Sequence, residues 1–214
     1  VMMHLHMGGA ERSLVNLLSE INYNQYEVDL LLIKKEGDLI RQLPKEVNLI
    51  DTPYELKAVY CNSIDSIRGV KYFLMRGMSV AYSNIKNKIK RCDLTAIRWN
   101  QFYKGLIPQF EKKYDVAIAY LTGPSMYYVA DKVNAGKKIV FYHSDYIASN
   151  AMVNQPTDLP YFEKFDLIPT ISEKCRDSLR AVFPKMESKF VVIPNITSTR
   201  LIKMRADENY PTEY

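Results

Sequence analysis

Short apolar runs alternate with amphipathic stretches along most of this chain of 214 residues, and no other feature constrains the fold as much. The runs have the length and apolar content of strands that are covered on both faces. They are residues 1–6, 27–33, 47–51, 115–121, 138–143, 167–171 and 190–193. Helical spacing of apolar residues predicts helices over 10–21, 38–43, 124–133 and 172–183. Strands that alternate with helices indicate an α/β fold, in which a mostly parallel, doubly wound sheet has helices on both faces.

Glycine and proline refine these boundaries. Gly136 is placed to end the helix over 124–133. Pro169 suggests an edge or end position for the short strand that contains it. Between the third and fourth strands, 63–76 and 80–113 are predicted to be mostly helical. We expect residues 1–200 to form one domain and residues 201–214 to begin a polar linker.

Composition narrows the class of protein. Apolar residues make up 47% of the chain and charged residues 25%, as in ordinary globular proteins. No apolar run approaches the roughly 18 residues that a membrane-spanning helix needs, and residues 1–6 lack the basic leader of a signal peptide. The cysteines Cys61, Cys92 and Cys175 are widely spaced, which argues against a disulfide framework or a zinc site. We therefore predict a cytoplasmic protein without a disulfide framework or a zinc site.

Positive charge is concentrated in one part of the chain. Residues 68–113 contain 11 basic and only two acidic residues, with many aromatic and aliphatic side chains between them, whereas the whole chain has a net charge of +5. A basic, amphipathic stretch of this kind can lie on anionic lipid headgroups. The alternative is an ordinary solvated helix face over a core. No nucleic-acid-binding motif accompanies the charge, so we do not expect a nucleic-acid partner.

The first candidate site is the turn at Gly8-Gly9. A strand, two glycines and then a helix direct backbone N–H groups at an anion. The dinucleotide pattern G-x-G-x-x-G and the G-K-S/T of a phosphate loop are both absent. The turn is therefore either an anion or sugar site or a simple tight connection. His4 and His6 just before it could chelate a metal from one strand face, but packing at a strand end is favoured.

Further candidates follow the later strands. His143 and Asp145 lie at the carboxyl end of a predicted central strand, at the sheet edge where open α/β folds bind ligands. Their side chains could hydrogen-bond sugar hydroxyls, or they could simply cap the strand end. Ser172 has the position of a helix N-cap, with a direct ligand role as the less favoured alternative. Asn195 follows Pro194 where the chain leaves the last strand.

The segment Met7-Gly-Gly-Ala-Glu-Arg-Ser-Leu-Val-Asn-Leu-Leu18 resembles the opening of glycosyltransferase family 4. Lys138 to Asp145 is similar to the family's strand that ends in His, and the stretches 165–172 and 191–195 are similar to its approach to the interdomain hinge. Together these stretches extend over nearly the whole chain. The region 58–109 matches no motif of the family and looks like its variable acceptor-side region.

The resemblance implies one Rossmann-like half of a two-domain, GT-B type fold. This half would mostly bind the acceptor, while a second domain, absent from these residues, would bind the nucleotide-sugar through an E-x₇-E motif and basic residues. The reaction would be retaining and metal-independent, and would build cell-envelope or capsular polysaccharide. Gly8, Gly9, Glu11 and Arg12 would line the cleft, near either the donor phosphate or the acceptor. His143 would contact the transferred sugar, Asp145 and Ser172 would be weaker cleft candidates, and Asn195 would mark the hinge side.

Several expectations follow from this resemblance. The 214 residues alone should be catalytically inactive. If the acceptor is linked to a lipid, the protein should make peripheral contact with the inner face of the cell membrane through 68–113. Two alternatives stay open: half of a sugar-nucleotide epimerase of the same architecture, or a stand-alone module that binds a sugar phosphate without chemistry.

Overall fold

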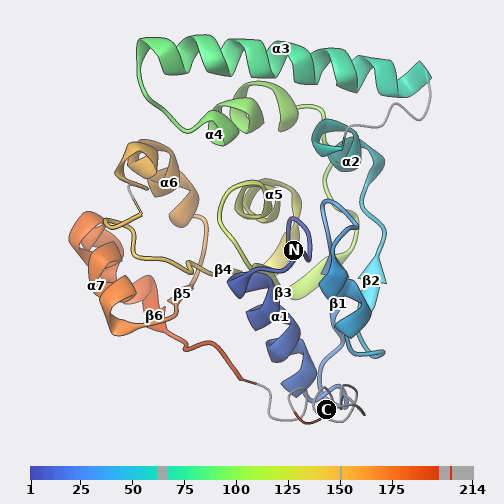
Figure 1. Cartoon of the computed structure of the whole chain (residues 1–214), viewed down its shortest axis with the longest axis vertical. Coiled ribbons are helices and arrows are strands. Elements are labelled where there is room, and N and C mark those ends of the chain that lie inside the picture. Colours follow the sequence, from blue (N-terminus) through green and yellow to red (C-terminus); the bar gives the residue numbers. More distant parts are fainter. Residues whose placement is uncertain (62–66, 150, 198–202, 204–214) are drawn as a thin grey trace, which may run out of the picture.

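The computed structural model describes residues 1–61, 67–149, 151–197 and 203, and shows a mixed α/β fold (Figure 1). The strands are β1 (Asp29–Leu31), β2 (Asn48–Ile50), β3 (Lys113–Ala119), β4 (Asn134–Val140), β5 (Ile168–Thr170) and β6 (Phe190–Val192). The α-helices are α1 (Gly9–Glu20), α2 (Tyr54–Tyr60), α3 (Ile67–Ile89), α4 (Leu94–Arg98), α5 (Pro124–Lys132), α6 (Gln155–Phe162) and α7 (Glu173–Val182). Single turns of other helix types are η1 (Asp38–Gln42), η2 (Trp99–Tyr103), η3 (Ala151–Asn154) and η4 (Pro184–Lys189).

The strands form the parallel pairs β1–β2, β3–β4 and β5–β6. The segment 1–5 lies between the first two pairs. Met2 exchanges backbone hydrogen bonds with Leu31 and Ile33 beside β1, and Val1 accepts one from Tyr120 beyond β3. Parallel bridges from β4 join it to the segment that contains β5. These contacts give the spatial order β2, β1, segment 1–5, β3, β4, β5, β6.

Two apolar cores lie on opposite faces of these strands. Leu30 and Leu32 belong to one core, with α1 and η1, whereas Leu31 and Ile33 belong to the other, with α2 to α7. The same alternation runs through β3 and β4. Because successive side chains of a strand point to opposite faces, both faces of the strands are covered. One face is covered by α1 and η1 and the other by α2 to α7.

A buried carboxylate ties the helices of the larger core together. The Asp131 side chain, at the end of α5, accepts hydrogen bonds from Trp99 Nε1 at 2.9 Å and Lys164 Nζ at 2.6 Å. The Lys104 ammonium lies 3.2 Å away. Burial opposes the charge, but these donors hold the pKa of Asp131 below its usual value. One ionised group thus links α5 to η2 and to the segment after α6.

The structure corrects several boundaries. Gly136 does not end α5; it lies within β4, where its Cα approaches the Asp115 carbonyl too closely for a larger residue to fit easily. β5 is not at an edge, because it pairs with β6 and is bridged to β4. Pro169 has no N–H to donate toward β4, which accounts for bridges there in place of a continuous ladder.

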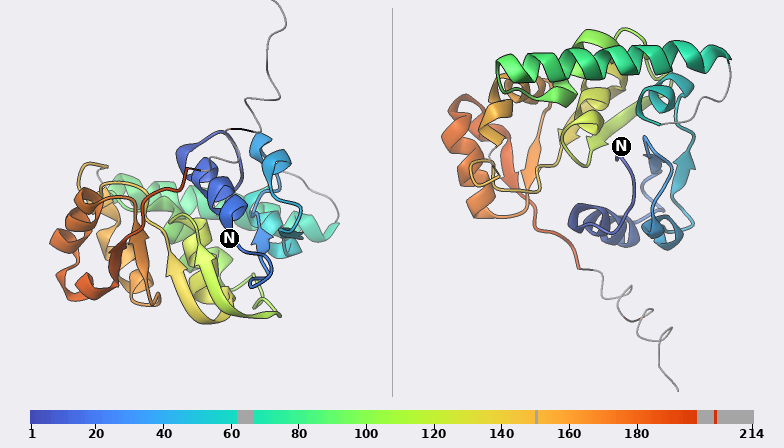
Figure 2. Two further views of the ribbon diagram at one scale, coloured as in Figure 1. Left: turned by 90° about the horizontal axis from the view of Figure 1, so that it is seen from below. Right: turned by 45° about the horizontal axis from the view of Figure 1, so that its top comes forward.

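The middle of the chain differs most from the prediction. α3 runs unbroken through Gly77, and helical structure stops at η2, well before residue 113. Residues 62–66 of the first predicted helix lie outside the described residues. The helices α2 and α6 were not predicted. α3 packs on α2, α4 and η2, and it lies across one side of the molecule (Figure 2).

Gly37 and Gly77 form a matched pair for a stability test. Gly37 has φ of 124°, and a Cβ there would collide with the backbone carbonyl of Leu5. Gly77 lies within α3 with open space around it. We expect Gly37→Ala to lower the free energy of unfolding by about 2–3 kcal/mol. Gly77→Ala should raise it by roughly 0.5–1 kcal/mol, since alanine loses less backbone entropy in a helix. Urea titrations measure both, and equal effects of the two substitutions would contradict the backbone argument.

A second stability test concerns the buried carboxyl of Asp158 on α6, which accepts a hydrogen bond from Tyr146 at 2.8 Å. Burial raises the pKa of Asp158 to about 7 in the folded protein. The unfolded chain releases this proton near pH 4, so the folded state binds more protons between pH 4 and 7, and stability falls as pH rises through that window. Asp158→Asn should remove this component, which amounts to about 2–4 kcal/mol.

The measurement is the free energy of unfolding of the wild type and of Asp158→Asn at several pH values from 4 to 8. The variant should gain on the wild type as the pH rises. Asp115→Asn, at an exposed carboxylate, serves as the control and should show a constant difference. A constant difference for Asp158→Asn as well would show that its carboxyl ionises normally.

Candidate functional site

The candidate site lies at the carboxyl ends of the central strands. The order in which successive strands are added to the sheet changes direction there. Segment 1–5 leads through α1 to β1 across one core, whereas β3 leads through α5 to β4 across the other. The connections therefore diverge to opposite faces between segment 1–5 and β3. In open α/β sheets such a divergence leaves a crevice where ligands bind. The Gly8-Gly9 turn and Tyr120 flank this position.

The Gly8-Gly9 turn is filled by the chain's own carboxylate. The side chain of Glu11, in the first turn of α1, packs directly against Gly8, so that a Cβ on Gly8 would overlap it. Glu11 is buried, and its Oε1 lies 3.7 Å from Nδ1 of His4. A negative charge at a helix N-terminus is stabilised by the helix dipole. The turn is therefore occupied by a carboxylate and is not a vacant anion site.

His143 lies beside this carboxylate, just beyond β4. Its Nε2 is 3.0 Å from the Tyr120 carbonyl oxygen. Because a carbonyl only accepts, Nε2 carries the proton and Nδ1 of the neutral ring is an acceptor. Burial lowers the pKa of His143, opposed by the Tyr120 carbonyl and by the charge of Glu11, so the ring is neutral at pH 7. Nδ1 is buried and has no hydrogen-bond partner among the residues that the structure describes.

A hydrogen-bond chain joins three distant segments at the same edge. Ser13 Oγ donates to Asn195 Oδ1 at 2.8 Å and lies 2.9 Å from the Tyr120 hydroxyl. Since the single Ser13 proton points to Asn195, the Tyr120 hydroxyl donates to Ser13. Asn16 also donates to the Ile196 carbonyl, so the chain that leaves β6 runs back to α1 (Figure 1). Asn195 therefore lies beside α1, near the central strands, although β6 is the outermost strand on its side of the sheet.

The remaining predicted residues have local roles. Asp145 Oδ1 accepts hydrogen bonds from the amides of the loop that follows it and from Ser178, which together hold the pKa of Asp145 below its usual value. Ser172 caps α7 by accepting from the Cys175 amide at 3.3 Å, as the N-cap prediction requires. Arg12 is exposed and contacts Met7. These side chains do not contact the Glu11 and His143 group.

Sequence reasoning missed three members of this group, namely His4, Ser13 and Tyr120. The position of Tyr120 could have been noticed, because it ends a predicted strand just as His143 does. Ser13 gave no signal, since a serine on an apolar helix is ordinary. His4 was predicted to pack at a strand end, with metal binding as the alternative, and its contact with Glu11 was not foreseen.

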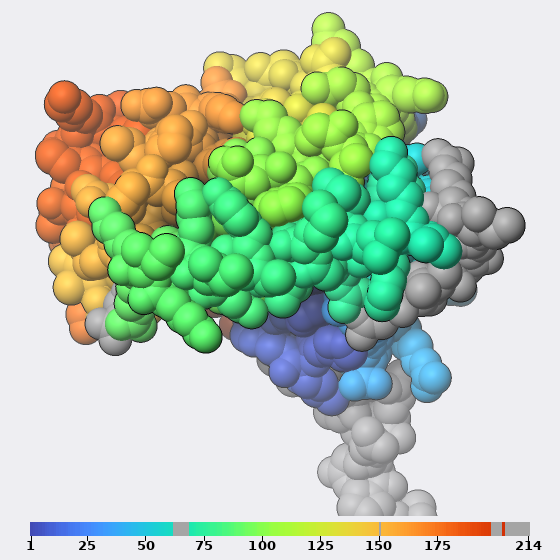
Figure 3. Space-filling model, turned by 90° about the horizontal axis from the view of Figure 1, so that it is seen from above, coloured from blue at the N-terminus to red at the C-terminus, as the bar shows by residue number. Residues whose placement is uncertain are grey.

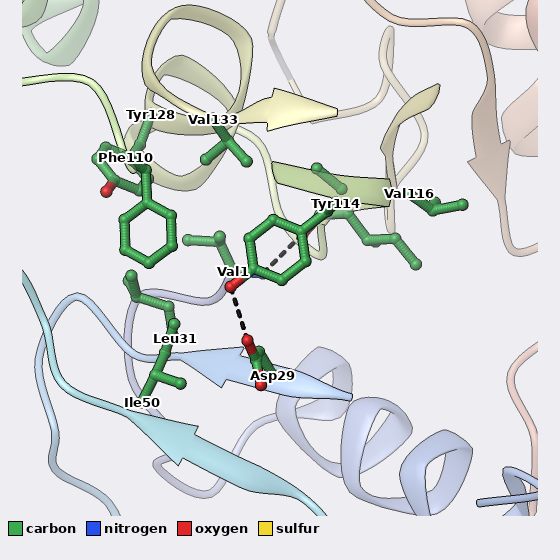
Figure 4. Close-up of a pocket in the computed structure, with 11 residues that line it drawn as sticks. Val1, Asp29, Leu31, Ile50, Phe110, Tyr114, Val116, Tyr128 and Val133 are labelled. Carbon is green, nitrogen blue, oxygen red and sulfur yellow. Dashed lines mark hydrogen bonds between the residues drawn. The ribbon is translucent and has the colours of Figure 1, made fainter. Parts of the chain in front are cut away.

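A small cavity lies elsewhere, between the amino-terminal ends of β1 and β3 (Figure 4). Its volume is about 60 Å³, comparable to two water molecules. The Tyr114 hydroxyl crosses it to donate to Asp29 at 2.7 Å, and Lys112 donates to the same oxygen. A sugar does not fit this space, and none of the lining residues belongs to the candidate site.

Metal ligands do not gather among the residues that the structure describes: no three His, Cys, Asp or Glu side chains lie together as a metal site requires. The rings of His4 and His6 are tilted by 55°, with centroids 4.7 Å apart, but His4 faces Glu11 while His6 faces Glu36. Comparison with known proteins gave no match to a protein-family model and none to a curated protein.

The Ser13 and Tyr120 pair is testable as a unit. Ser13→Ala leaves the buried Tyr120 hydroxyl without its acceptor and should lower the free energy of unfolding by about 1–3 kcal/mol. Adding Tyr120→Phe removes the orphaned group, so the double variant should be less destabilised than the sum of the two singles. Urea unfolding of all four proteins gives the coupling energy. Additive effects would mean that the two hydroxyls do not interact.

Proposed function

We propose that this chain is the acceptor-side domain of a retaining glycosyltransferase, which moves a sugar from a nucleotide-sugar to a glycan or lipid-linked acceptor in cell-envelope or capsular polysaccharide synthesis. Its strands would form the Rossmann-like, doubly wound sheet of one GT-B half. The proposal rests on the sequence resemblance and on the geometry of the candidate site together.

One observation carries the proposal: side chains from four separate segments meet at the carboxyl edge. Glu11 comes from the first turn of α1, Tyr120 from beyond β3, His143 from beyond β4 and Asn195 from beyond β6. Three of the four were expected to be site residues before their positions were known. Such convergence supports a ligand site, because core packing alone needs no polar groups there.

The charge of the group favours a neutral, hydroxylated ligand. Glu11 is a carboxylate, and His143 is neutral with a free acceptor nitrogen. A phosphate would meet repulsion from Glu11, whereas a sugar hydroxyl could donate to Glu11 or to Nδ1 of His143. Of the two roles that the resemblance allows for the Gly8-Gly9 turn, the acceptor role is therefore favoured over contact with the donor phosphate.

The residues then have distinct tasks. Gly8 leaves room for the Glu11 carboxyl, which orients one acceptor hydroxyl. His143 accepts from a second hydroxyl and holds the sugar at the reacting face. Asn195 fixes the exit of the chain toward the donor-binding half. Asp145 and Ser172 shape the neighbouring loops and do not touch substrate.

The test uses the full-length native protein with a panel of nucleotide-sugars and cell-envelope acceptors, and follows nucleoside diphosphate release and the anomeric form of the product. His143→Phe keeps the ring contacts with Tyr120 and Phe141 but removes both nitrogens. It should raise KM for the acceptor and lower kcat/KM about 10²-fold, which corresponds to loss of two buried hydrogen bonds. His6→Ala, at an exposed histidine, is the control and should retain activity.

Inversion at the anomeric carbon would contradict the retaining mechanism. Full activity of a folded His143→Phe variant would remove His143 from the site. Binding of sugar phosphates without transfer by the native protein would replace the transferase with a binding module.

A further inference from the structure

The outer face of α3 is apolar, which is the reverse of what a surface helix normally shows. Its exposed side chains recur at helical spacing along the whole element and define what we term the α3 ridge. They are Val70, Phe73, Leu74, Met78, Tyr82, Ile85 and Ile89. Ile85 is 60% exposed and Ile89 is 81% exposed. A contiguous exposed apolar surface of this extent marks an interaction site.

The inner face of α3 is unusually polar. Ser79 and Ser83 are fully buried; Ser79 Oγ lies 2.7 Å from the Tyr103 hydroxyl, and Ser83 Oγ accepts from Arg98. The helix therefore meets the domain through Tyr72, which is buried in the larger core, and through these two small hydroxyl side chains, and it directs most of its other large apolar side chains away from the domain. Specific hydrogen bonds with η2 and α4 therefore determine which face of α3 points inward.

The charge on and after α3 indicates what covers the ridge. The helix contains no acidic residue, and the exposed lysines 71, 86, 88 and 90 lie along it and just beyond it. Lys86 Nζ lies 5.3 Å from the centre of the Tyr82 ring. Apolar and aromatic side chains flanked by lysines are the pattern of helices that lie in the interface of an anionic membrane.

The shape of this side of the molecule agrees with a flat partner. α3 extends across it as one straight element, with no other described helix outside it (Figures 1 and 3). A helix of 23 residues is roughly 35 Å long at 1.5 Å per residue. No described helix is long and apolar enough to cross a membrane. Contact would therefore be lateral, along the length of the ridge.

We propose that the α3 ridge docks the protein on an anionic lipid surface, with the ridge side chains in the acyl boundary and the neighbouring lysines against the headgroups. This inference stands apart from the glycosyltransferase proposal, since it uses no residue of the candidate site. Whether the protein is a glycosyltransferase or a module that binds a sugar phosphate, it would lie with α3 against the membrane.

The experiment is flotation of the native protein with vesicles of phosphatidylcholine alone or with 30% phosphatidylglycerol, in low and high salt. Binding should require the anionic lipid and weaken as salt rises. Leu74→Gln/Met78→Gln should reduce binding about tenfold or more by removing apolar insertion. Lys86→Gln/Lys88→Gln should reduce it similarly and make the remainder less sensitive to salt.

Matched controls carry the same chemical changes elsewhere on the surface. Met152→Gln/Leu159→Gln replaces two exposed apolar residues near and within α6, and Lys45→Gln/Lys185→Gln removes two exposed lysines. Both should bind as the wild type does, and circular dichroism checks that every variant is folded. Absence of binding to anionic vesicles, or losses equal to those of the controls, would overturn the proposal. So would a dimer in light scattering that Leu74→Gln/Met78→Gln dissolves while vesicles stay unbound.

Discussion

The backbone hydrogen bonds of segment 1–5 are the constraint on which the rest of the structure depends. Met2 joins this segment to β1 on one side, and Val1 joins it to the chain beyond β3 on the other. Without these bonds the pair β1–β2 has no connection through the sheet to β3–β4. The same segment then turns at Gly8 and starts α1, so the element that joins the two halves also delivers Glu11 to their boundary. Fold and candidate site are therefore set by one short stretch of extended chain.

The candidate site places a buried carboxylate next to a neutral imidazole, and each limits what the other can do. Glu11 favours protonation of His143, but burial opposes it more strongly. The ring therefore stays neutral, and its proton is held on Nε2 by the Tyr120 carbonyl. A neutral ring with a fixed tautomer is suited to recognising hydroxyl groups by direction, rather than to attracting an anion by charge. The arrangement thus favours hydroxyl groups over anions, although a glycine turn at a helix start is otherwise suited to phosphate.

The sequence predicted β1 to β6, α1, α5 and α7 because each is specified locally, by apolar spacing and by capping residues such as Ser172. The predicted strand over 1–6 is instead an extended segment with one isolated bridge at Met2. The sequence-based prediction was wrong where tertiary contacts determine the local structure. Pro169 lies inside the sheet, where it lacks an N–H donor but its carbonyl still accepts a hydrogen bond from Tyr142. Local sequence rules do not predict this position. Gly136 is required by the approach of β3, not by a helix end. In the candidate site, the local sequence predicted that the chain turns at Asn195. It could not predict the hydrogen bond from Ser13, which is 182 positions away in the chain.

For the same reason, the sequence of α3 predicted an amphipathic helix but not which of its faces points inward. Positive charge and apolar residues along 68–113 indicated an amphipathic element, but periodicity cannot say which face is inward. Apolar side chains would ordinarily be assigned to the core. Ser79 and Ser83 reverse that assignment, because their hydroxyl groups are paired beneath the helix with Tyr103 and Arg98. Two small polar residues therefore decide that the apolar stripe faces outward. The apolar stripe and the lysines beside it then lie together on one surface, and the proposed contact with an anionic lipid layer depends on both.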